Sequence, residues 1–148
     1  VLAAMRKPPP EIYRRFVERW RQAQQRWGLH DQLNEYYISG HPGCTLADMI
    51  ELAVRLKAMG LRPEQVQDFY PAPLSLAAAM FYTGRDPRTG APVYVARTDR
   101  EKTLQRALLL CHLPEFQAKA REALIEAGRS DLIGVLIPAA GRRVVTRR

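Results

Sequence analysis

The residues best suited to chemistry gather in one short stretch, YYISGHPGCTLADMIEL, at positions 36–52. Ser39, His41 and Cys44 lie within six positions of one another, around the turn GHPGC. An imidazole can serve as a base or a metal ligand, and a helix start lowers the pKa of a nearby thiol. Free N–H groups at a helix N-terminus also favour anionic or polar ligands. The stretch therefore predicts a ligand site lined by Ser39, His41 and the backbone near Gly43.

Each of these residues also has a structural explanation that needs no ligand. His41 precedes a proline and has no second histidine at a short spacing, which favours a hydrogen-bonded turn residue over a metal ligand. A catalytic thiol requires a partner base in the right geometry, so we expect Cys44 to be structural. Cys111 lies on an apolar helix face and is predicted to be a core residue. The turn itself could be a tight connection into a well-capped helix.

A second polar pair, Gln67 and Asp68, interrupts the otherwise apolar segment VQDFY at positions 66–70. Successive residues of a strand point to opposite faces, so one of the two side chains should face the interior. A polar group there needs a partner, which can be water, protein or ligand. Gln67 or Asp68 is therefore a further candidate for a ligand-binding residue.

Residues 36–70 have the pattern of a strand, a helix and a second strand. Aromatic and β-branched residues favour strands at 36–40 and 66–70. Between them, Thr45 and Asp48 form a variant of the capping box at the start of a helix. Parallel strands joined by a helix bind ligands at their carboxyl ends, where HPGCT and PAP lie. Such a sheet needs more than two strands, so we expect part of it to lie outside this sequence.

The rest of the pattern is mainly helical. An amphipathic helix is expected over 10–27, because apolar residues recur there at three- and four-residue steps. Asp99 is predicted to cap a later helix. The other predicted segments are a short helix at 74–82, an extended segment at 93–96, helices at 99–111 and 115–127, and an apolar segment at 131–138.

The 148-residue chain has a net charge of +8, and the excess lies at its two ends. Residues 1–30 carry a net +5 and the tail GRRVVTRR a net +4, whereas the middle is close to neutral. Nucleic-acid binding would need the two ends to meet on one face; a solvated helix face and a disordered basic tail at 139–148 are the simpler explanation. No run of 18 apolar residues is present, so no membrane partner is expected. Two cysteines do not suggest a disulfide framework, and we expect a cytoplasmic protein.

The segment YYISGHPGCTLADMIELAVRLKAMGLRPEQVQDFYPAPLSLAAAMFYTGRDP, followed by PVYV, resembles the C-terminal part of the YgiQ-type radical SAM proteins. The later segment REKTLQRALLLCHLPEFQAKAREALIEAGRSDLIG is similar to the C-terminal extension of that family. The resemblance implies an α/β fold, a C-terminal fragment of a partial (β/α)6 barrel with about two parallel strands, followed by a mainly helical extension. In this scheme residues 1–83 belong to the barrel, 84–138 form the extension and 139–148 are the tail.

By resemblance, the parent proteins use a [4Fe–4S] cluster to cleave S-adenosylmethionine reductively. Ser39, His41, Gly43 and Gln67 would lie on the S-adenosylmethionine side, whereas the catalytic residues and the substrate stay unknown. The cluster needs three thiolates spaced CxxxCxxC, and this sequence has two cysteines 67 positions apart. We therefore assign no metal ligand here and expect the cluster motif to precede residue 1. The chain alone should not bind cluster or cofactor stably.

The resemblance implies that the partner is the remainder of the barrel, joined in the same polypeptide. Two alternatives stay open. The chain could be a docking module for a separate chain that carries the cluster. It could also be a stand-alone basic helical protein that binds nucleic acid, in which case binding should weaken steeply with salt.

Overall fold

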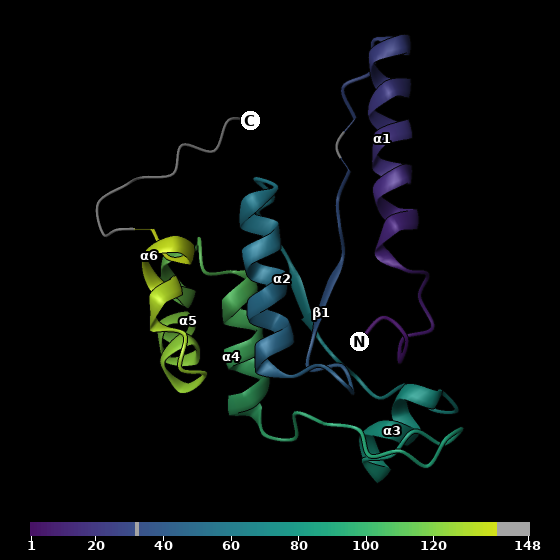
Figure 1. Cartoon of the computed structure of the whole chain (residues 1–148), viewed down its shortest axis with the longest axis vertical. Helices are drawn as coiled ribbons and strands as arrows, with labels where there is room; N and C mark the ends of the chain where they lie inside the picture. Colours follow the sequence, from purple (N-terminus) through teal and green to yellow (C-terminus); the bar gives the residue numbers. More distant parts are fainter. Residues whose placement is uncertain (32, 139–148) are drawn as a thin grey trace.

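A computed structural model describes residues 1–31 and 33–138 of the chain (Figure 1). The predicted disordered tail at 139–148 lies outside these residues. The elements are α1 (Pro10–Trp27), β1 (Tyr37–Ser39), α2 (Leu46–Ala58), β2 (Val66–Asp68), α3 (Leu76–Thr83), α4 (Asp99–Leu109), α5 (Pro114–Glu126), a 3-10 turn (Ser130–Leu132) and α6 (Ile133–Leu136). No helix in the described ranges is both long and apolar enough to cross a membrane.

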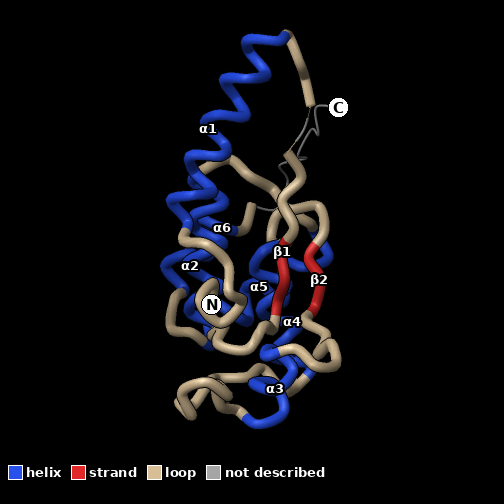
Figure 2. The backbone as a smooth tube through the Cα atoms, turned by 90° about the vertical axis from the view of Figure 1, so that its right-hand side faces the viewer, coloured by secondary structure: helices blue, strands red, loops and turns tan. Residues whose placement is uncertain are grey.

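The two strands pair in parallel, as the strand–helix–strand pattern predicts. Tyr37 lies opposite Val66, Ile38 opposite Gln67, and Ser39 opposite Asp68. Tyr37 and Val66 both belong to the apolar core, so their face of the sheet points toward the helices. Figure 2 shows α2, α4 and α5 behind the strands, while the opposite face is free of helices. The described part of the chain therefore forms a sheet that is covered on one face only.

The core lies between α2, α4, α5 and α6. Its most deeply buried large side chains come from different elements: Met49, Leu104, Leu108, Leu124 and Leu136. The inward face predicted for α4 is confirmed, because Leu104, Ala107, Leu108 and Cys111 are all buried. α4 packs against both strands as well as against α2 and α5. The predicted helical extension, residues 84–138, therefore supplies the layer that lies directly on the sheet.

The helix starts depend on side-chain caps. Thr45 and Asp48 form the predicted capping box at the start of α2. The prediction that Asp99 caps α4 is wrong. Thr98 is the cap, because its hydroxyl accepts from the Glu101 N–H at 3.1 Å, while Glu101 accepts from the Thr98 N–H at 2.9 Å. The threonine hydroxyl reaches the third helical residue, and Asp99 becomes the first residue of the helix.

Because Glu101 is a titratable part of the cap of α4, the stability of this helix should depend on pH in the acidic range. The N–H and hydroxyl of Thr98 lower the pKa of the Glu101 carboxyl below its usual 4.5. Stability from this cap is therefore full above the unfolded pKa and is lost as the pH falls through the lowered folded pKa. We expect Glu101→Ala to cost about 0.5–1 kcal/mol at pH 7, and the difference from the original chain to shrink as the pH falls below the unfolded pKa.

Urea unfolding of the two chains between pH 7 and pH 3 measures this difference. Glu64→Ala is the control, because the Glu64 side chain is exposed in the loop before β2. A difference for Glu101→Ala that stays constant down to pH 3 would contradict the charged cap.

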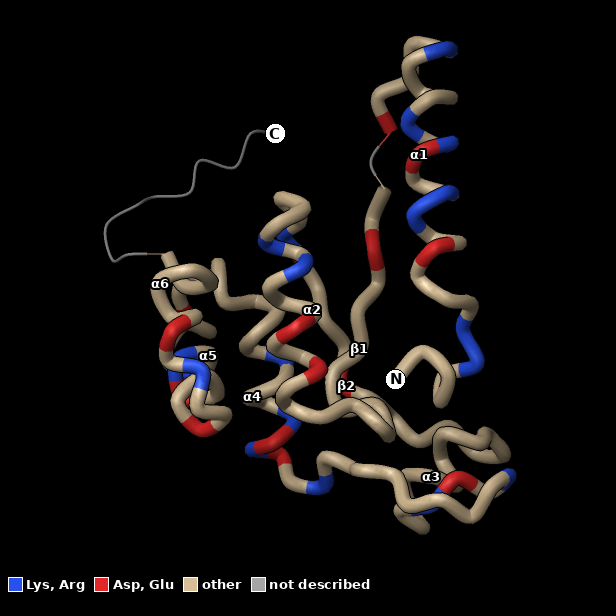
Figure 3. Tube along the Cα trace, in the orientation of Figure 1, with Lys and Arg blue, Asp and Glu red and all other residues tan. Residues whose placement is uncertain are grey.

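α1 begins and ends as predicted, with Pro10 in its first turn and Gly28 in the left-handed conformation after its last residue. None of its residues is buried, and Trp27 is 69% exposed. Figure 1 shows α1 apart from the other helices, and Figure 3 shows its basic residues interspersed with acidic ones. The apolar stripe predicted for this helix exists, but the described residues do not cover it.

Candidate functional site

A hollow of about 540 Å³ lies at the carboxyl ends of the strands, lined by the sheet residues Ile38 and Gln67, by residues 4–7 and by the start of α3. Two of the four predicted ligand residues, His41 and Gln67, line it. The remaining lining residues are Ala4, Met5, Arg6, Lys7, Ile38, Asp68, Phe69, Tyr70, Ser75, Leu76 and Ala77. This volume falls in the range of sites for small molecules and cofactors.

Gln67 faces the hollow because successive side chains of β2 point to opposite faces of the sheet. It pairs with Ile38, and both line the hollow, whereas their neighbours Val66 and Tyr37 pack into the helical core. Gln67 is exposed, and its side-chain amide has both a donor and an acceptor to offer. Asp68 also lines the hollow, but both of its carboxylate oxygens accept hydrogen bonds within the protein, so Gln67 is the residue of the pair that we assign to ligand binding.

Ser39 lies on the opposite, helix-covered face and is fully buried. Its hydroxyl donates to Asp68 Oδ1 at 2.6 Å, and Arg106 Nη1 on α4 donates to Asp68 Oδ2 at 2.8 Å. These bonds link β1, β2 and α4 through three side chains. The Ser39 hydroxyl also lies 3.3 Å from the Gln67 carbonyl oxygen, so it is used within the protein, while the Gln67 side chain points to the other face of the sheet.

His41 reaches the hollow because the chain turns sharply at Gly40, which has a φ of +71°. Burial lowers the pKa of the imidazole, which favours the neutral ring near pH 7. Nδ1 lies 2.8 Å from the carbonyl oxygen of Pro42, and a carbonyl only accepts, so Nδ1 carries the proton. The other nitrogen, Nε2, is then a hydrogen-bond acceptor. The ring also packs edge-on against Phe69, with centroids 4.9 Å apart.

Gly43 does not line the hollow. Its N–H donates to the carbonyl oxygen of Tyr94 at 2.8 Å, and the Cys44 N–H donates to the His41 carbonyl at 2.9 Å. The capping box of Thr45 and Asp48 occupies further N–H groups at the start of α2. The N–H groups of Gly43, Cys44 and Thr45 therefore bond within the protein, and Gly43 contributes its left-handed conformation, with a φ of +81°.

Gln105 is a residue of this region that the sequence reasoning missed. Its side chain is 1% exposed, accepts from the Gly40 N–H at 2.8 Å and donates to the Cys44 carbonyl at 2.8 Å. One amide thus bonds both ends of the turn 40–44. The sequence does contain a signal for Gln105: it lies three residues before Leu108, and this helical spacing places it on the core-facing side of α4.

Both thiols are buried, which agrees with the structural roles expected for them. Burial raises the pKa of Cys44 to about 11, and nearby Asp48 acts in the same direction. Desolvation therefore outweighs the lowering that a helix start provides. Burial also raises the pKa of Cys111, whose Sγ lies 3.5 Å from the Leu136 carbonyl oxygen. Neither environment suits a reactive thiolate.

We expect both cysteines to resist alkylation in the folded protein. The thiolate is the reactive form, and a pKa near 11 leaves about one Cys44 in a thousand ionised at pH 8. Modification by iodoacetamide at pH 8, followed by mass spectrometry, should be at least about tenfold slower in buffer than in denaturant. Fast single labelling of Cys44 in the folded chain would contradict this assignment.

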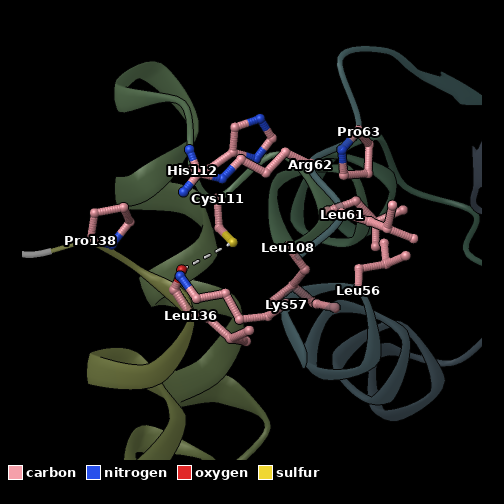
Figure 4. A pocket seen from close by; sticks show the side chains of 12 residues that line it. Leu56, Lys57, Leu61, Arg62, Pro63, Leu108, Cys111, His112, Leu136 and Pro138 are labelled. Carbon is pink, nitrogen blue, oxygen red and sulfur yellow. Dashed lines mark hydrogen bonds between the residues drawn. The ribbon is translucent and has the colours of Figure 1, made fainter. Parts of the chain in front are cut away.

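A second hollow, of about 40 Å³, lies between α2, α4 and α6 (Figure 4). Leu56, Leu61 and Leu108 form its apolar part, and Arg62 and His112 lie at its edge. This space suits a few water molecules and is too small for a cofactor. No three His, Cys, Asp or Glu side chains gather into a metal site anywhere in residues 1–31 and 33–138. The hollow beside His41 and Gln67 is therefore the better candidate.

The fold and site thus define a parallel strand–helix–strand unit with a ligand-sized hollow at its carboxyl edge. Residues 64–147 match the family model of a domain of unknown function, DUF3362, and the chain belongs to this family. The match begins before β2 and includes α3, α4 and α5. The family region therefore joins one strand of the sheet to the helices that cover it.

The chain is also similar to larger proteins of the UPF0313 group. A UPF0313 protein of Geobacter sulfurreducens is 52% identical over 136 residues, which are 92% of this chain and 22% of that protein. Relatives from Methanosarcina mazei and Clostridium perfringens are 46% and 45% identical over 90% of this chain, and over 21% and 20% of their own lengths. The chain thus spans about a fifth of these relatives. No solved structure matches it.

Proposed function

We propose that the chain is the carboxyl-terminal part of a radical SAM barrel within a larger UPF0313 protein. β1 and β2 would be the last two strands of a partial (β/α)6 barrel, as the resemblance to the YgiQ-type proteins implies. The observation that carries this proposal is the one-sided sheet: helices cover the face of Tyr37 and Val66, while Ile38 and Gln67 line a hollow.

Parallel sheets occur almost only with both faces covered, and in a barrel the inner face is covered by the other strands. In the described residues β1 pairs with β2 alone, which leaves one edge of each strand without a partner. α1 also exposes an apolar stripe that includes Ile12, Phe16 and Trp27. These three unsatisfied features support additional strands from the rest of a longer protein.

The hollow has the volume and chemistry for the adenosyl part of S-adenosylmethionine. The amide of Gln67 and the acceptor nitrogen of His41 can hydrogen-bond polar groups of a nucleoside, and Phe69 and Tyr70 offer aromatic faces for a base. These residues would bind and orient the cofactor, which in the related enzymes supplies radical chemistry when bound.

An iron–sulfur cluster does not fit the residues of this chain. Cys44 and Cys111 are both buried, their pKa values are raised, and they lie in separate parts of the core. Cluster ligands are thiolates, so neither environment is suitable. The proposal therefore places the cluster in the part of the larger protein that this chain does not include.

Equilibrium dialysis of the larger protein with S-adenosylmethionine, prepared anaerobically with iron and sulfide, tests the proposal. We expect binding, and roughly tenfold weaker binding for Gln67→Ala if one polar contact to the ligand is lost. Glu51→Ala on the exposed side of α2 is the control and should bind normally. A larger protein that binds no S-adenosylmethionine, or a Gln67→Ala variant that binds normally, would overturn this assignment.

A further inference from the structure

The turn 40–44 is attached to the helical region at several points. Gln105 on α4 bonds the Gly40 N–H and the Cys44 carbonyl, each at 2.8 Å. Between these two bonds, the Gly43 N–H donates to the Tyr94 carbonyl at 2.8 Å. The start, middle and end of the turn are therefore each bonded to residues that come at least 50 positions later in the sequence.

Two further contacts join the same region to the strand ends. Arg106 on α4 donates to Asp68 at the end of β2, and Asp68 in turn accepts from Ser39 at the end of β1. Lys102, one turn earlier on α4, packs so closely on Gly40 that a Cβ there would lie 3.2 Å from Lys102 Cγ. The side of α4 that faces the strands therefore contacts Gly40, which follows β1, and Asp68, which ends β2.

We propose that α4 and the segment 93–98 act as a brace that sets the conformation of the turn 40–44, and that Gln105 is the positioning residue. Because His41 lies in this turn and lines the hollow, the brace places the imidazole where a ligand would meet it. The contacting residues belong to the region matched by DUF3362, whereas the turn precedes that region. The inference rests on the proposed function only for the identity of the ligand.

The type of residue at position 105 is important for this role. The side-chain amide provides one acceptor and one donor, as the N–H at one end of the turn and the C=O at the other require. Leucine has nearly the same volume but would leave both backbone groups buried without a partner. An apolar substitution should therefore loosen the turn while the surrounding helices keep their packing.

Amide hydrogen exchange and NMR of the His41 ring in the 148-residue chain test the brace without any ligand. We expect Gln105→Leu to speed exchange at Gly40 by at least about tenfold and to move the His41 ring signals. Leu124→Ala is the control for a general loss of core packing, because Leu124 is fully buried on α5, outside the turn and outside α4. If Gln105→Leu does not fold, Gln105→Met replaces it. Exchange at Gly40 no faster than in the Leu124→Ala control would overturn the proposal.

A second measurement separates the brace from the proposed function. In the larger protein, Gln105→Leu should bind S-adenosylmethionine roughly tenfold more weakly, and Leu124→Ala should bind it normally. Normal binding by Gln105→Leu would overturn its positioning role even if the proposed function holds. An original protein that binds no S-adenosylmethionine would overturn the proposed function alone, while the exchange data would still decide the brace.

Discussion

Replacing Leu108 by alanine should lower the free energy of unfolding by about 3–5 kcal/mol. Leu108 is fully buried in the last turn of α4, the helix that contacts α2, α5 and both strands. Its side chain also borders the 40 Å³ hollow near Leu136, so truncation would enlarge an existing space. Truncation removes the burial of the methyl groups and also leaves a cavity that the surroundings do not refill. Both effects lower the free energy of unfolding, so the loss should lie near the upper end of the range for leucine-to-alanine substitutions.

Urea unfolding followed by circular dichroism measures this loss. Ile125→Ala is the matched control, because Ile125 lies on α5 but is 56% exposed, and its truncation should cost less than about 1 kcal/mol. A loss below 1 kcal/mol for Leu108→Ala would mean that α4 does not pack as described.

Gly40→Ala should have the second-largest effect. Gly40 has a φ of +71°, a conformation that costs a residue with a Cβ about 1–2 kcal/mol. The added methyl would also lie 3.2 Å from Lys102 Cγ, so Lys102 must shift to admit it. We expect a total loss of about 2–3 kcal/mol, together with a displacement of His41, because the turn would move away from α4.

Gly60→Ala separates the two causes. Gly60 has the same φ of +71°, but nothing lies within 4 Å of the position of its Cβ. Its substitution should therefore show only the conformational cost. Equal losses for the two variants in thermal unfolding would argue that the close contact between Gly40 and Lys102 contributes nothing.

Elements whose signals are local in the sequence could be predicted. Pro10 and Gly28 bracket α1, and Thr45 with Asp48 starts α2, because caps and turns depend on neighbours a few residues away. The parallel pairing also followed from the strand–helix–strand order. The cap of α4 was misplaced by one residue, since Thr98 and Asp99 are both acceptable cap types and only the contact with Glu101 decides between them.

The site was harder to predict because it depends on contacts over long separations. Ser39 and His41 were expected to line one ligand site, but Ser39 is buried on the helix-covered face, and Gly40 between them has a left-handed φ of +71°. Gln105 bonds a turn that precedes it by more than 60 positions, and no local pattern encodes that meeting. His41 and Gln67 both line the hollow because they lie near the carboxyl ends of parallel strands, which share one edge of the sheet.

The position of α4 in the chain has a consequence for protein synthesis. The strands and their turn are complete at Asp68, but the helix that covers and fastens them begins only at Asp99. At a translation rate of about 5–20 residues per second, the strands wait roughly 2–6 seconds for this helix. Throughout that interval the face of β1 and β2 that α4 later covers stays exposed, and an exposed apolar strand surface is prone to aggregate. This segment should therefore need chaperone protection on the ribosome, and a pause in translation between residues 68 and 99 should lower its yield.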